Sequence, residues 1–337
     1  MPQSLKPLYD LIVVANKKRV ASNKDAGSRH AQKSSKPAFH LRGRESIAEG
    51  FSRTFNELLG AALAELGKSA QPVDDSVHEI RKAIKKSRAL LRLLRPALGG
   101  VCQDANAQLR SAGRALSELR DADALVGLVQ QIEKNHQGVA KEALQQARSR
   151  ILRRKREIVR HFTASKEVER ISRQLNDVQK AVASWPLEQA NAQTVASAIE
   201  NTVRRGRKAY TRAIATQRSE DFHEVRKRAK DLRYQLKFLS HLWPPVFDGY
   251  AESAKQLEQW LGEDHNLVIL RETLNGRKSP GGAEMNGVFA GLHKEQQRLR
   301  THANCLGMLI YSDKPKLWTR RMEDAWEARK QSKSSHL

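Results

Sequence analysis

Two segments of this chain combine a histidine with closely spaced arginines and lysines. VHEIRKAIKKSRALLRLLRP begins at Val77, and FHEVRKRAKDLRYQLKFL begins at Phe222. On a helix of about 100° per residue, the cations of each segment share one face and the apolar side chains share the other. The two basic faces contain the following residues: His78, Arg81, Lys82, Lys85, Arg88 and Arg92, and His223, Arg226, Lys227, Lys230, Arg233 and Lys237. Such side chains bind phosphate oxygens, and arginine does so through paired hydrogen bonds.

The same pattern would fit an ordinary amphipathic helix whose charges face water. Exposed helix faces usually mix Glu with Lys, however, because like charges four residues apart repel each other. Arg81, Lys85 and Arg88 are spaced to repel in this way, and the second segment repeats the arrangement. A bound polyanion would relieve this repulsion, so we interpret both faces as anion-binding. The two histidines fit ligand contact and a structural hydrogen bond at the helix start equally well.

Metal and enzyme chemistry fit the sequence poorly. HEIRK and HEVRK resemble the HExxH zinc motif, but Lys82 and Lys227 stand where the second histidine is required. LRDADAL (119–125) and LGEDHNL (261–267) contain paired carboxylates, which could bind a metal or perform acid–base catalysis. We favour a role for these carboxylates as partners of Arg and Lys side chains. Without a P-loop, dinucleotide-binding or serine-nucleophile motif, the sequence predicts a non-catalytic protein with no metal and no cofactor.

The motifs belong to an internal repeat. The basic segments align at an offset of 145 residues, and the acidic motifs align at an offset of 142. At one aligned position the charge is reversed, since Asp231 stands where the first segment has Lys86. Because both lie at the margin of the basic face, we expect little effect. Apolar residues recur at helical spacing, and no alternating β-branched run follows residue 44. The sequence therefore predicts an all-α fold of two related halves with roughly four helices each.

The predicted boundaries follow from the repeat and from local composition. The link between the halves is expected near Trp185. The predicted parts are a basic, low-complexity tail at 1–44, which is disordered or irregular, a first bundle at 45–188, a second bundle at 189–328 and a short tail at 329–337.

Composition restricts the class of partner. The 61 Lys and Arg exceed the 37 Asp and Glu, which gives a net charge of +24, and this charge attracts polyanions. Mean hydropathy is −0.65, and no apolar run is long enough for a membrane span. Cys102 and Cys305 are too few for a disulfide framework. With only a short apolar run, LIVVA, near its start, we expect a cytoplasmic protein.

Together the motifs resemble the CHAD domain family, which is named for conserved histidines in an α-helical domain. The resemblance rests on ESIAEGF, on the two basic segments, and on RDADAL and LGEDHNL, and it covers residues 45–328. It implies two four-helix bundles with pseudo-two-fold symmetry, which form one domain. It also implies that the twelve basic-face residues named above bind inorganic polyphosphate, and that the protein resides on polyphosphate granules, as some relatives do. Residues 1–44 lack the ExExK motif of the CYTH domain found in many relatives, so phosphohydrolase activity is not implied.

Two other functions remain open from the sequence. Nucleic-acid binding is the main alternative, since a net charge of +24 supports it in any protein. Against it, the basic faces contain a single aromatic residue, Tyr234, whereas single-strand binders commonly stack bases on aromatic rings. The second alternative is binding to an anionic membrane through residues 1–44, but this segment lacks the apolar face of an interfacial helix. Oligomeric state, protein partners and preferred polyphosphate length are not determined by the sequence.

Overall fold

The protein is described by a computed structural model, which defines residues 39–43, 45–68, 74–135, 141–275 and 283–334. These residues form helices and no strands, which confirms the all-α prediction. The first half contains α2 (Ile47–Gly67), α3 (Asp74–Leu93), α4 (Arg95–Asn135), α5 (Lys141–Ala164) and α6 (Glu167–Ala181). The second half contains α7 (Ala192–Thr216), α8 (Ser219–Leu239), α9 (Pro244–Leu274), α10 (Ala283–Tyr311) and α11 (Pro315–Ser334). None of the described helices could span a membrane.

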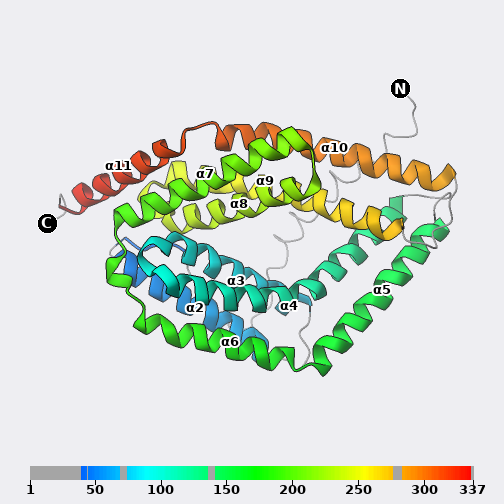
Figure 1. The fold of residues 1–337 in the computed structure, drawn as a ribbon, viewed down its shortest axis with the longest axis horizontal. Coiled ribbons are helices and arrows are strands. Elements are labelled where there is room, and N and C mark those ends of the chain that lie inside the picture. The colour runs from blue at the N-terminus through cyan, green and yellow to red at the C-terminus, as the bar shows by residue number, and fades with distance from the viewer. Residues whose placement is uncertain (1–38, 44, 69–73, 136–140, 276–282, 335–337) are drawn as a thin grey trace, which may run out of the picture.

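The two halves form two layers, with α7–α11 above α2–α6 in the view of Figure 1. In the first half, α2, α3, α4 and α6 pack in a ring, which is the expected four-helix bundle, and α5 packs against α4 outside it. The second half repeats this order, with α8 between α7 and α9, α11 on α7, and α10 on α9. Within the described residues, each half therefore has one helix more than the four predicted. Lys166, in a left-handed conformation with φ 52°, separates α5 from α6.

Local sequence explains where the first helix begins and where the halves join. The side chain of Ser46 accepts a hydrogen bond from the Glu49 backbone, and the Glu49 side chain bonds back to the Ser46 backbone, which is a capping box. Two short 3-10 turns, Val182–Ser184 and Leu187–Gln189, separate α6 from α7 near the expected link. The bundle boundary at residues 188 and 189 stays a prediction.

One large apolar core extends through both halves. Phe51, Phe55 and Trp185 form an aromatic cluster in it, with ring centroids 5.1–6.2 Å apart. A smaller core, which includes Val129 and Leu270, lies where the α4–α5 and α9–α10 hairpins extend to the same side. Because both cores contain residues from both halves, the halves are packed together as one unit.

Packing begins before the predicted start of the bundle at residue 45. Phe39 and Leu41 are buried, and the Leu41 N–H donates to the carbonyl of Phe238 at 2.8 Å. The Phe39 ring meets Tyr234 edge-on, with centroids 5.9 Å apart. The last residues of the expected tail therefore belong to the folded domain, and residues 1–38 lie outside the described part.

The two halves meet through the helices that carry the basic segments. The Gln235 side chain of α8 donates to the Ala89 carbonyl of α3 at 3.3 Å, and Arg92 forms an ion pair with Asp231 at 2.8 Å. α4 and α9 also contact each other, and they pack against α3 and α8 respectively. Four helices, two from each half, thus surround the centre of the molecule.

Candidate functional site

Four cations from the basic faces meet between the two halves. Arg81 and Lys85 of α3 and Arg226 and Lys230 of α8 are half-buried, and we call them the central basic cluster. Their proximity is seen in the pKa of Lys85, which is lowered by burial, by the charges of Lys230 and Arg81, and by that of Arg226. The structure therefore brings four of the twelve predicted site residues together.

The two lysines of the cluster differ in their partners. Lys230 lies 3.2 Å from an oxygen of Glu258 on α9, and Arg233 lies 2.8 Å from the other oxygen. Lys85 has no hydrogen bond or ion pair within the described residues. Burial and the nearby charge of Lys230 lower the pKa of Lys85 to about 7. Lys85 thus has no direct partner in the described part of the protein, although the charge of Glu258 opposes the lowering of its pKa.

The two arginines of the cluster are held against α4 and α9. Arg81 donates to the Gly113 carbonyl at 3.3 Å and also to the Ser117 hydroxyl. The Arg226 guanidinium lies on Gly262, where an added Cβ would stand only 3.1 Å from Nη2, so glycine permits this close approach. Arg226 Nε is buried with no hydrogen-bond partner among the described residues. The pKa of both arginines is lowered, mainly because burial removes water from the charged guanidinium.

Next to the cluster, Arg88 and Arg92 make contacts that hold helices together. Arg88 Nε donates to Asn106 of α4 at 3.0 Å. The pKa of Arg88 is lowered to about 10, mainly by burial and next by the charge of Arg92. Arg92 pairs with Asp231, which also pairs with Arg228 at 3.2 Å. Asp231 was expected to have little effect, but this carboxylate lies at the joint between the halves and pairs with a predicted site residue.

Three other predicted residues face outward and have carboxylate partners. Lys82 pairs with Glu79 at 3.1 Å, Lys227 with Glu224 at 3.2 Å, and Lys237 with Asp248 at 2.8 Å. The basic faces therefore carry more internal neutralisation than the sequence pattern indicated, because some of the acids lie just beside the arc or on another helix. These lysines do not join the central basic cluster.

The two predicted histidines are not equivalent in the structure. His223 lies 4.6 Å from His265 between ring centroids, and its Nδ1 is buried without a described partner. Burial, followed by His265 and the nearby cations, lowers the pKa of His223 to about 4. His78 is exposed, and its pKa is lowered by partial burial and by Arg120. Sequence reasoning missed His265, although it stands in the LGEDHNL motif.

Two carboxylates of the acidic motifs, Asp123 and Asp264, pair with cations, as we favoured. Asp123 forms an ion pair with Lys155 of α5. Asp264 is buried and accepts from Arg300 of α10 at 2.8 Å. Asp121 lies near the central basic cluster and opposes the lowering of the pKa of both of its arginines. Within the described residues, no group of three His, Cys, Asp or Glu side chains is placed to hold a metal ion.

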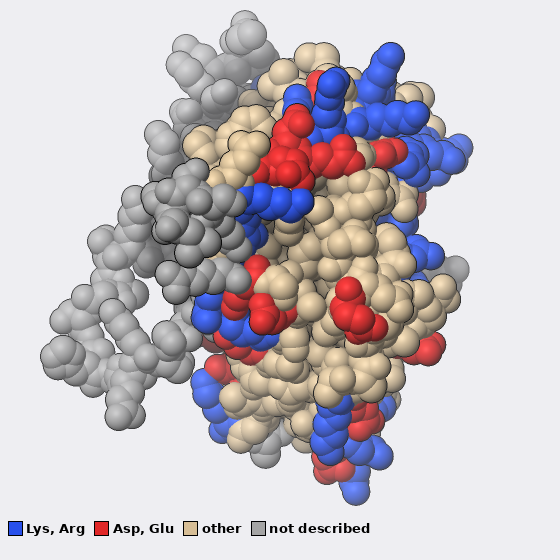
Figure 2. Space-filling view, turned by 90° about the vertical axis from the view of Figure 1, so that its left-hand side faces the viewer, with Lys and Arg blue, Asp and Glu red and all other residues tan. Residues whose placement is uncertain are grey.

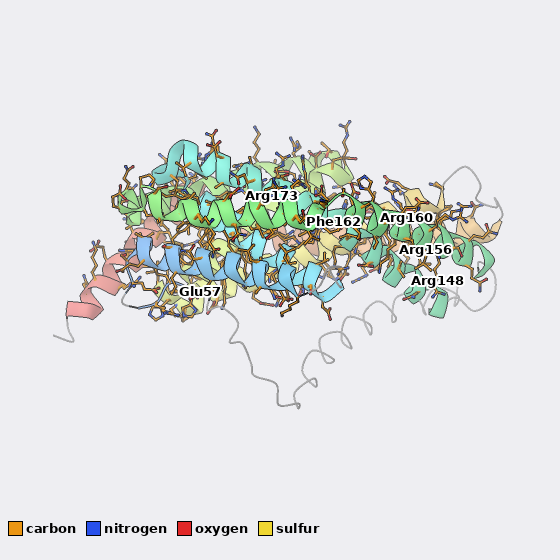
Figure 3. All side chains as sticks on the ribbon, turned by 90° about the horizontal axis from the view of Figure 1, so that it is seen from below. Glu57, Arg148, Arg156, Arg160, Phe162 and Arg173 are labelled. Atoms are coloured by element: carbon orange, nitrogen blue, oxygen red, sulfur yellow. The ribbon has the colours of Figure 1, made fainter. Side chains whose placement is uncertain are left out.

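Other basic stretches lie outside the cluster. Figure 3 places Arg156 and Arg160 along α5, beyond the paired helices α2 and α6. In the 204–212 stretch, Arg204 pairs with Glu200 at 2.6 Å, and Arg212 pairs with a carboxylate of α8 at 2.6 Å. Figure 2 shows acidic and basic side chains interspersed on one end of the molecule. The half-buried cations between the halves therefore differ from this mixed surface.

Comparisons with known proteins agree with this architecture. The CHAD domain family model matches residues 53–275. The crystal structure of the CHAD domain from the plant Ricinus communis is similar, with a TM-score of 0.52 and 14% sequence identity. The similarity covers 79% of this chain and 97% of that chain, and at this identity it concerns the fold. No curated protein matched the sequence.

Proposed function

Because the chain belongs to the CHAD domain family, we propose that it binds inorganic polyphosphate at the central basic cluster without catalysing a reaction. The observation that carries this proposal is Lys85, a half-buried cation with no partner among the described residues. Holding it beside Lys230 is unfavourable in the free protein, as its lowered pKa indicates. An anion bound there would offset this cost.

Polyphosphate matches the chemistry of the cluster. It is a flexible chain of repeated charges with no base to read, so it requires only cations at suitable positions. Arg81 and Arg226 can offer paired N–H groups to phosphate oxygens, and Lys85 and Lys230 can add point charges. Exposed ion pairs contribute only about 0–1 kcal/mol each, but half-buried cations acting on one chain contribute more. We expect tight binding that weakens as salt is added.

Nucleic-acid binding receives less support from the structure. The aromatic residue of the basic faces, Tyr234, is buried at 6% exposure and packs against Phe39, so it offers no platform for stacking a base. Phosphate contacts alone would let DNA bind through charge, with no preference over other polyanions. We therefore propose polyphosphate as the preferred ligand.

The test is a titration of long-chain polyphosphate, duplex DNA and single-stranded DNA, matched in charge, at about 0.15 M salt. A central variant replaces four residues by alanine: Arg81, Lys85, Arg226 and Lys230. A matched control variant replaces two exposed arginines and two exposed lysines of the outer helices by alanine: Arg173, Lys180, Lys294 and Arg320. Both lose the same charge, and circular dichroism with thermal melting checks that both are folded.

We expect wild type and control to prefer polyphosphate, and the central variant to lose that preference. Equal affinity of wild type for DNA and polyphosphate would overturn the proposal. Equal losses in the two variants would overturn it too, because net charge would then explain the binding. Phosphate release during incubation with polyphosphate would contradict the absence of catalysis.

The same proposal extends to location. A protein that binds polyphosphate tightly in the cytoplasm collects where the polymer is stored, so we propose that it resides on polyphosphate granules. A fluorescent fusion in cells that accumulate polyphosphate should form foci that coincide with stained polymer. The central variant should remain diffuse at the same expression level, and foci formed equally by both proteins would refute this location mechanism.

A further inference from the structure

The repeat makes the two halves similar in shape, but within the described residues only the second half supplies a carboxylate that forms an ion pair with a lysine of the cluster. Glu258 of α9 contacts Lys230 at 3.2 Å and Arg233 at 2.8 Å. At the offset of 142 residues that aligns the acidic motifs, Glu258 corresponds to Leu116 of α4, which is fully buried. At the position equivalent to Glu258, α4 therefore carries a leucine, which cannot form an ion pair with a cation of α3.

A second aligned pair shows the same difference. Asp248 of α9 contacts Lys237 at 2.8 Å, and its counterpart at the same offset is Asn106 of α4. Asn106 accepts a hydrogen bond from Arg88 at 3.0 Å but brings no charge. At both positions, the second half neutralises its cations with its own side chains and the first half does not.

The result is a cluster whose members are not equally available to a ligand. In the first half, Arg81 is occupied by Gly113 and Ser117, while Lys85 has no described partner. In the second half, Lys230 is occupied by Glu258, while Arg226 Nε has no described partner. Each half thus contributes one engaged and one unengaged cation.

We infer that Glu258 is an internal counter-ion that occupies the second half of the anion site, so that the bound chain places a phosphate on Lys85 rather than on Lys230. This inference rests on the proposed function and adds that the site is asymmetric. Glu258 competes with the ligand for Lys230 and Arg233, because one of its oxygens already contacts each of these cations. It thereby sets both the affinity and the position of the bound chain.

A purely structural role for Glu258 makes a different prediction. If it only holds Lys230 and Arg233 in place, Glu258→Gln lowers thermal stability and either leaves or weakens polyphosphate binding. If it competes with the ligand, the same variant binds polyphosphate more tightly. Glutamine keeps the shape, and its carbonyl oxygen can still accept a hydrogen bond from one of the two cations, so the fold is expected to persist.

The experiment measures polyphosphate affinity for two pairs of full-length variants. Lys85→Ala should lose about tenfold or more in affinity, while Lys230→Ala should lose less than about threefold. Glu258→Gln should gain about threefold or more. Its control, Glu252→Gln, removes an exposed carboxylate of the same helix that pairs with Lys255 at 2.7 Å, and it should change affinity by less than about twofold.

A further variant gives the first half the negative charge that Asp248 carries at the equivalent position of the second half. Asn106→Asp gives Arg88 a carboxylate partner and should weaken polyphosphate binding by about threefold or more. Its control is Asn201→Asp on α7, an exposed asparagine that accepts from Arg204 at 3.3 Å. The control should leave affinity almost unchanged. This pair keeps the inference testable if Glu258→Gln does not fold.

The outcomes separate this inference from the proposed function. If wild type does not prefer polyphosphate, the proposed function fails. If it does, but Lys85→Ala and Lys230→Ala lose equally and Glu258→Gln gains no more than Glu252→Gln, the site is symmetric and only the inference fails. If Glu258→Gln does not fold, the second pair of variants decides. Equal changes in polyphosphate affinity for Asn106→Asp and Asn201→Asp would then show that only the inference fails.

Discussion

Polyphosphate affinity should fall as the pH rises through neutrality, because of Lys85. In the free protein, burial and the charge of Lys230 hold the pKa of Lys85 at about 7 instead of 10.5. A bound phosphate favours the charged form and raises this pKa. The affinity that Lys85 contributes is therefore fully present below the free pKa and is lost as the pH rises from there towards the bound pKa.

The size of the effect follows from the free pKa. With a value of about 7, Lys85 is about 90% charged near pH 6 and about 10% charged near pH 8. If only the charged form contacts phosphate, affinity falls about tenfold between these two conditions. Near pH 7, each binding event should take up about half a proton at this site.

Isothermal titration calorimetry in buffers of different ionisation enthalpy counts these protons. The comparison is Lys85→Arg, since arginine stays charged over this whole range. His223 and His265, whose pKa values are lowered by burial, take up protons in both proteins alike, so the difference between the two isolates Lys85. Equal pH slopes for wild type and Lys85→Arg, or no difference in proton uptake near pH 7, would refute the reasoning.

Two further predictions concern stability. Asp231→Asn removes the partner of Arg92 at the joint between the halves. Because the Asp231 and Arg92 side chains are only 10% and 24% exposed, the free energy of unfolding measured in urea should fall by roughly 1–3 kcal/mol. An unchanged midpoint would mean that this ion pair contributes nothing. Gly206→Ala would place a Cβ 2.4 Å from the buried Tyr311 ring and should cost about 1–3 kcal/mol in the same assay. Gly113→Ala is its control, since its nearest contact is 3.4 Å away, and a similar loss there would contradict the steric explanation.

The fold could be predicted largely from the sequence, because helical periodicity and the repeat act over long stretches. The basic segments, which were expected to be helical, did form α3 and α8. The break between α5 and α6 was missed, because it depends on one left-handed residue, Lys166, that carries no glycine or proline signal. Phe39 was missed because its burial depends on Tyr234 and the rest of α8, which are distant in sequence.

The site was only partly predictable, because a helical wheel describes one helix and neutralisation involves several. On the wheel, Lys85 and Lys230 are equivalent members of two similar faces. In the structure α9 supplies Glu258 to one of them, whereas α4 carries Leu116 at the equivalent position and supplies no carboxylate to the other. Aligning the halves beyond the basic segments would have revealed this difference, since the offset of 142 residues already pairs the two positions. In a repeat that binds one ligand, the positions where the halves differ in charge therefore indicate how the ligand lies, and those where they agree indicate only that it binds.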